Sequence, residues 1–149
     1  MSLTTEFADQ IARVESRLQA VRADRATREI RPGGWRGIEV LGHLIDSALN
    51  NHQRFVRAAQ EGTYAGPGYN GPGWVKAHGY VEMSWSDVLA SWRRENALLA
   101  RVVERIPEAQ LAASCRVGDK EPVPLGSLIE SYLRHLHHHL AQLERLSES

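Results

Sequence analysis

Four long segments of the chain carry apolar residues at the spacing of an amphipathic helix, and this periodicity limits the folds open to it. The second segment is expected to run from about Gly37 to about Glu61, the third from Trp85 to Ile106, and the fourth from Pro124 to about Arg145. Strand signals are nearly absent. Four helices of about twenty residues each are best accommodated by an antiparallel four-helix bundle, so we predict an all-α fold with long irregular connections. In the first segment the apolar residues step by three or four positions: Leu3, Phe7, Ile11, Val14, Leu18 and Val21.

The length and the charge balance predict that residues 1–149 form a single domain with no polyanionic partner. Lys and Arg number 18, Asp and Glu also number 18, and the two signs are interleaved, so the sequence does not favour nucleic-acid binding. No apolar run is long enough to span a membrane, and the N-terminal residues lack the pattern of a signal peptide. One cysteine, Cys115, cannot form an intrachain disulfide. We therefore expect no membrane partner and a cytoplasmic location.

The connection from Gly62 to Met83 is dense in glycine and proline and is expected to lack regular structure. It also contains aromatic residues, among them Tyr69 and Trp74, which are uncommon in disordered segments. One interpretation is a packed lid over a functional site, with Tyr69 and Trp74 binding substrate. The other is a covering loop that closes one end of the core.

Four of the seven histidines lie in the last helical segment, at His135, His137, His138 and His139. Projected at 100° per residue, His139 falls inside the apolar stripe and His135 on its edge, whereas His137 and His138 lie outside it. Residues four apart are neighbours on a helix, so His135 and His139 can direct their imidazoles at one point, as two metal ligands must. The alternative is a pair of ordinary hydrogen-bonded core histidines.

A third ligand has to come from another helix, and the second segment offers His43 and His52. Periodicity favours His52, which projects onto the apolar face. His43 projects nearly opposite, beside a row of polar residues typical of the wall of a site. The residues alone leave both candidates open.

Two motifs together resemble the DinB/YfiT-like superfamily of metal-binding four-helix bundles. That family has a tryptophan, a glutamate and then His-Leu in its second helix, and H-x-x-H-H-x-x-Q or H-x-x-H-H-x-x-H in its fourth. The resemblance spans nearly the whole chain. The matching residues are Trp35, Glu39, Val40, Leu41, His43, Leu44, Asp46, Ser47, Asn50, Arg54 and Phe55, followed by His135, His138, His139 and Gln142.

The resemblance implies that His43, His135 and His139 bind a divalent transition metal, with zinc or nickel favoured. Three neutral imidazoles leave a coordination position open, as in catalytic sites of this kind. Two positions depart from the family. Arg36 stands where the family prefers a capping Ser or Thr, and Gln142 stands where some thiol-transferase members have histidine.

The resemblance implies a metal-dependent enzyme of the thiol S-transferase or hydrolase type, which activates a thiol or water for a small-molecule substrate. A low-molecular-weight thiol is one candidate substrate. Asn50 and Gln142 are candidates for orienting ligands through hydrogen bonds, and Asp46 is a candidate for the same role or for proton transfer. The resemblance also implies a homodimer.

The alternative function is a non-catalytic bundle that binds a metal or another ligand, or that assembles as a structural dimer. It is motivated by Leu136, which follows His135 where an H-E-x-x-H protease would have its glutamate. The roles of His52, His138 and Cys115 stay open.

Overall fold

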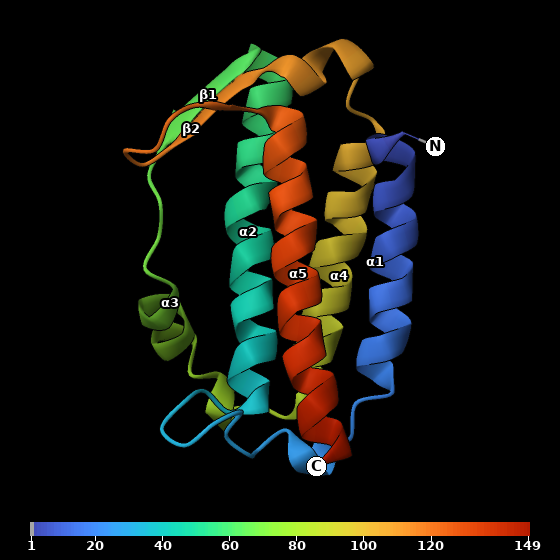
Figure 1. The fold of residues 1–149 in the computed structure, drawn as a ribbon, viewed down its shortest axis with the longest axis vertical. Helices are drawn as coiled ribbons and strands as arrows, with labels where there is room; N and C mark the ends of the chain where they lie inside the picture. Colours follow the sequence, from blue (N-terminus) through green and yellow to red (C-terminus); the bar gives the residue numbers. More distant parts are fainter. Residues whose placement is uncertain (1) are drawn as a thin grey trace.

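The computed structural model describes residues 2–149 and is built around four long helices (Figure 1). They are α1 (Leu3–Gln19), α2 (Gly37–Glu61), α4 (Trp85–Glu104) and α5 (Leu125–Glu148). The predicted four-helix bundle is thus confirmed, with helix bounds close to those expected. Large apolar side chains from all four helices are fully buried between them: Phe7, Leu18, Leu41, Leu44, Phe55, Trp92, Leu99, Leu125, Ile129, Leu136, Leu140 and Leu143.

The bundle is not antiparallel throughout, which corrects the expected arrangement. Helix α2 packs against α4 and α5, and α1 packs against the same two helices. In Figure 1, α1 and α5 run downwards from the upper end, whereas α2 and α4 run upwards. Each helix therefore has one parallel and one antiparallel neighbour. The parallel pairing of α2 with α4 requires the connection between them to return along the length of the bundle.

The fold is not strictly all-α, because a small sheet lies at the upper end of the bundle (Figure 1). Strand β1 (Thr63–Gly66) pairs in parallel with β2 (Ser114–Val117), starting with Thr63 opposite Ser114. Strand β2 also pairs antiparallel with β3 (Val123–Pro124). The sheet ties the α2–α4 connection to the α4–α5 connection.

The connection after α2, expected to be irregular, also contains a short helix. Helix α3 (Gly71–His78) is followed by the 3₁₀ turn η2 (Tyr80–Glu82), and both pack against α2. The Asn70 side chain accepts a hydrogen bond from the Gly73 amide and so caps α3. The second face of α2 is therefore covered by the same chain.

Helix α2 begins at Gly37 even though Arg36 replaces the expected capping residue. The Glu39 carboxylate accepts a hydrogen bond from the Arg36 amide at 3.0 Å, which is half of a capping box. Helix α4 begins as the sequence predicts, because the Ser84 hydroxyl accepts from the Asp87 amide at 3.1 Å.

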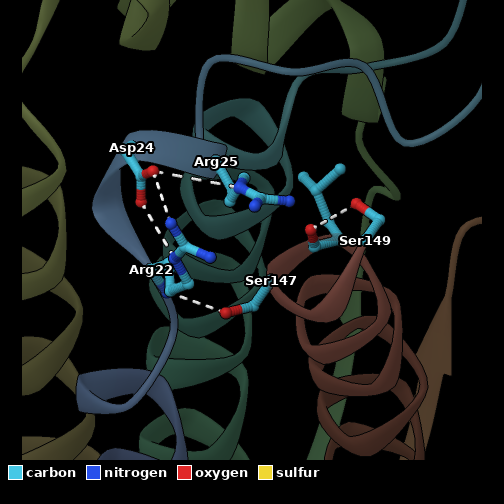
Figure 2. Close-up of polar contacts among 6 residues, drawn as sticks. Arg22, Asp24, Arg25, Ser147 and Ser149 are labelled. Carbon is cyan, nitrogen blue, oxygen red and sulfur yellow. Dashed lines mark hydrogen bonds and ion pairs between the residues drawn. The ribbon is translucent and has the colours of Figure 1, made fainter.

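The lower end of the bundle is closed where the α1–α2 connection contacts the end of α5, as Figure 2 shows. The turn η1 (Ala23–Arg25) follows α1, and the Arg22 amide just before it donates to the Ser147 hydroxyl at 2.9 Å. Arg22 also pairs with Asp24 at 2.9 Å. A further short turn, η3 (Glu108–Ala112), follows α4. Within residues 2–149, no helix is long and apolar enough to cross a membrane.

Candidate metal centre

Three histidines from two facing helices meet at one point between α2 and α5. The Nε2 atoms of His43 and His135 lie 3.0 Å apart, and those of His135 and His139 lie 3.1 Å apart. One nitrogen from each of the three rings falls within a set that spans at most 4.8 Å. Helix geometry explains two of the three members of the cluster, because His135 and His139 are one turn apart on α5. The facing turn of α2 supplies His43.

The spacing of the nitrogens suits a shared metal ion. Imidazole nitrogens bind zinc at about 2.0–2.1 Å, so two ligands of one ion lie no more than roughly 4 Å apart. Both Nε2 pairs meet this limit. The donor set of three imidazoles suits a transition metal of the zinc, nickel, iron or copper type.

The surroundings keep the imidazoles neutral, which is the form that binds a metal. Burial and the neighbouring His135 and His139 lower the pKa of His43 to about 4. Burial and the neighbouring His139 and His138 likewise lower the pKa of His135 to about 4. The pKa of His139 is also lowered, mainly by burial. At neutral pH all three rings therefore carry a free nitrogen lone pair.

Gln142 fixes the orientation of His139. The Nδ1–H group of His139 donates to the Gln142 side-chain oxygen at 2.8 Å. Because Nδ1 carries the proton, Nε2 of the neutral ring has its lone pair directed at the other two histidines. A hydrogen bond of this kind is the usual support of a metal-ligating histidine.

His43 is held by two segments outside the bundle. The Trp35 ring packs on it with centroids 4.8 Å apart. On another side, a Cβ at Gly71 would lie 3.3 Å from the His43 ring, so the start of α3 closely approaches that ring. The other ring nitrogen, Nδ1, is buried and has no hydrogen-bond partner among the described residues.

Asp46 lies one turn beyond His43, but its carboxylate contacts Tyr80 and His78 rather than the histidine cluster. Its side chain is fully buried, and Oδ1 accepts from the Tyr80 hydroxyl at 2.7 Å and pairs with His78 at 2.9 Å. Burial is the main cause of a raised pKa at Asp46. These contacts attach α3 and η2 to α2. Asn50, the other candidate on α2, donates to the Asp46 carbonyl of its own helix at 2.8 Å.

The remaining histidines do not join the cluster. His52, which periodicity favoured, pairs with Glu95 of α4 at 2.7 Å. His137 donates to Gln10 of α1 at 3.0 Å, and His138 is exposed. The helical projection of α2 failed because α3 and η2 bury a second face of this helix, on which His43 lies.

A cavity of about 400 Å³ adjoins the cluster at His135 and extends between α2, α5 and the sheet. Tyr69, predicted to bind substrate, lines the cavity, whereas Trp74 does not, and the role of Tyr69 stays a prediction. Trp74 packs on Tyr69 with ring centroids 5.6 Å apart and on His78 at 5.9 Å. Its role in substrate binding stays a prediction.

The cavity also contains residues that were not singled out from the sequence as site residues. Lys120 and Glu121 reach it from the β2–β3 turn, and Cys115 reaches it from β2. Burial raises the pKa of the Cys115 thiol, which disfavours the reactive thiolate. Arg54 lines the cavity from α2. The sequence already indicated Arg54, because it matches the family motif and shares a helix face with His43 and Ser47. The local sequence around the sheet residues does not predict that they line the cavity. Their position depends on the pairing of β1 with β2, which are 51 residues apart in the sequence.

The fold and the site together define a class: four-helix bundles in which two facing helices bring histidines to one point. A family model described as the DinB superfamily matches residues 4–143. The chain therefore belongs to the DinB superfamily, as the two motifs indicated.

YfiT of Bacillus subtilis (strain 168) is a relative by sequence and by structure. It is 25% identical over 137 residues, which cover 91% of this chain and 77% of YfiT. A solved structure of YfiT, described as a probable metal-dependent hydrolase with an unusual four-helix bundle topology, matches with a TM-score of 0.87. That match covers 99% of this chain and 89% of the YfiT chain at 24% identity.

Proposed function

We propose that this protein is a metal-dependent enzyme that activates a thiol or a water molecule at the centre formed by His43, His135 and His139. The observation that carries the proposal is the convergence of three neutral imidazoles on one point beside a cavity. The description of YfiT as a metal-dependent hydrolase supports the same class of chemistry. Zinc or nickel is the proposed metal, because imidazole ligands suit both.

A bound divalent metal of this kind would supply Lewis-acid chemistry and lower the pKa of a thiol or water in contact with it. The residues of the chain have separate tasks. His43, His135 and His139 hold the ion, and Gln142 keeps the proton of His139 on Nδ1. Trp35 and the start of α3 restrict water around His43.

The cavity sets where a substrate would lie. Because His135 is part of both the cluster and the cavity wall, a ligand in the cavity would reach the centre from the side of α5. Thiol transfer is favoured over simple hydrolysis as the reaction, since the cluster itself contains no carboxylate among the described residues to act as a general base. A thiol needs less help in losing its proton than water does. A cytoplasmic location, where thiols are kept reduced, is part of the proposal.

The experiment is a thiol-conjugation assay on the full chain. Metal-loaded protein should conjugate a low-molecular-weight thiol to a chlorinated arene faster than metal-stripped protein, and His43→Ala should lose this difference. His138→Ala is the matched control, because His138 is exposed beside the cluster. Equal rates with and without metal would contradict the proposal and favour a non-catalytic metal-binding bundle.

A further inference from the structure

Arg54 is a buried cation that forms no ion pair with any residue that the structure describes. Only 5% of the residue is exposed. The ion pairs formed among residues 2–149 do not include it. A buried charge is costly unless it is paired, so an isolated guanidinium in this position needs an explanation.

The contacts of Arg54 leave part of its guanidinium free. One terminal nitrogen, Nη2, donates to the Pro67 carbonyl at 3.2 Å. The guanidinium carbon lies 5.7 Å from the centre of the Tyr69 ring. Nε is buried and has no hydrogen-bond partner within residues 2–149. These contacts hold the side chain at the wall of the cavity and use one of the five N–H donors of the guanidinium.

The cavity is positively charged overall. Lys120 and Arg134 line it together with Arg54, and Glu121 is the one carboxylate among its lining residues within the described part of the chain. Glu121 is exposed and does not pair with Arg54. The remaining polar lining, including the neutral imidazole of His135, is uncharged at neutral pH. An anionic group would therefore be attracted into the cavity and could accept a hydrogen bond from Arg54.

The position of Arg54 sets the length of such a ligand. Arg54 and His43 are eleven residues apart on α2, which corresponds to roughly 16 Å along a helix that rises 1.5 Å per residue. The cavity is lined by His135 of the cluster and by Ser47, Asn51 and Arg54 of α2, and these three residues share one face of the helix. A small anion could not reach both ends.

We propose that Arg54 is the anion-binding end of the substrate cavity, so that the ligand is an elongated thiol with a carboxylate or similar anion remote from its sulfur. The placement of the ligand's sulfur at the three histidines rests on the proposed function. The placement of its anionic group at Arg54 does not. Lys120 and Arg134, which line the same cavity as Arg54, add positive charge near the anionic part of the ligand. A guanidinium favours carboxylate because it can donate from a rigid planar group.

The first test measures the selectivity of the cobalt-loaded protein for a charged over a neutral thiol. The absorption of the cobalt reports thiolate binding to the metal. The probes are 8-mercaptooctanoate and its neutral analogue 8-mercaptooctanol. The charged thiol should bind about tenfold more tightly or better, as expected for a hydrogen bond to a charged group. Arg54→Gln should remove the preference, and Arg54→Lys should keep part of it. With 3-mercaptopropionate, which is too short to reach both ends, Arg54→Gln should change little.

The second test separates this proposal from the proposed function. Octanoate and 1-octanol are titrated calorimetrically into the protein as purified, with no thiol present. If octanoate binds more tightly than 1-octanol and Arg54→Gln loses this difference, the anion site is supported. This holds even if neither thiol changes the cobalt spectrum, because that result would contradict only the proposed thiol chemistry. Equal affinity of the wild-type protein for the charged and neutral members of both probe pairs overturns the proposal, and this result does not depend on any variant folding. A preference that survives in folded Arg54→Gln overturns it as well, and would leave Arg54 as a clamp on Pro67 and Tyr69.

Discussion

At the scale of single residues, the site depends on how neutral imidazoles are kept together. Like charges so close to one another would repel, and burial disfavours the charged form of each ring. The sequence indicated His135 and His139 by their spacing on one helix. It could not decide between His43 and His52 from periodicity, because the outcome depends on which segments cover the second face of α2.

The lowered pKa values predict how the metal-free protein responds to acid. His43 and His135 have a pKa of about 4 in the folded chain, against roughly 6.5 when unfolded. The unfolded chain therefore binds more protons between these values, and folding stability should fall as the pH drops from about 6.5 toward 4. Urea unfolding across this range measures the effect, which should be smaller in His135→Gln. A stability that stayed constant or rose on acidification would contradict the assigned neutral state.

Gln142 should matter for metal affinity and little for folding. Its oxygen accepts from His139, and loss of such a supporting hydrogen bond typically weakens metal binding by about 10–100-fold. We expect Gln142→Leu to show this loss in a competition titration with a chelator. Gln19→Leu is the control, since Gln19 is exposed on α1 and should retain the wild-type affinity. Equal affinities in the two variants would show that Gln142 does not support the site.

At the scale of elements, the long helices could be predicted and the small ones could not. An apolar stripe that continues over several turns predicts each of the long helices, α1, α2, α4 and α5. Helix α3 is only eight residues long, too short for a clear period, and it begins with Gly-Pro-Gly. Strands β1 and β2 are four residues each and are defined by pairing with each other rather than by their own pattern.

Trp74 of α3 is predicted to support the wall of the cavity. Trp74 packs on Tyr69, which lines the cavity, so Trp74→Ala should loosen the cavity wall and weaken substrate binding several-fold while leaving the metal content unchanged. Trp85→Ala is the matched control, because Trp85 is also half-buried but lies on α4 away from this cavity.

Metal content, melting temperature and the Michaelis constant should be measured on the same preparations. If Trp74→Ala lowered only the melting temperature and left the kinetics of the folded protein as in the wild type, the segment would be a covering loop rather than a lid.

At the scale of the whole molecule, the sequence predicted the bundle but not the order of its helices. An apolar stripe shows which face of a helix is buried, but many arrangements of four helices satisfy four stripes. The parallel contact between α2 and α4 is made possible by the long segment 62–84, which returns along the bundle. The length of that segment was visible in the sequence, whereas its path was not.

The oligomeric state is a prediction at this scale. The family resemblance implies a homodimer, although α3 with η2 already covers the second face of α2 within one chain. Leu49 of α2 and Leu98 of α4 are exposed by 39% and 52%, and these are the apolar residues that a partner on this side would cover. We expect sedimentation to give the mass of a dimer, and Leu98→Glu to shift it toward monomer. A monomer mass at high protein concentration would contradict the prediction.

The central claim is that His43, His135 and His139 together bind one metal ion. Elemental analysis of the purified, metal-reconstituted chain tests it most directly. The account predicts about one transition-metal ion per chain, lost in His43→Ala, His135→Ala and His139→Ala, and retained in His52→Ala, His137→Ala and His138→Ala. A wild-type protein without bound metal, or a loss of metal in His52→Ala with retention in His43→Ala, would contradict it.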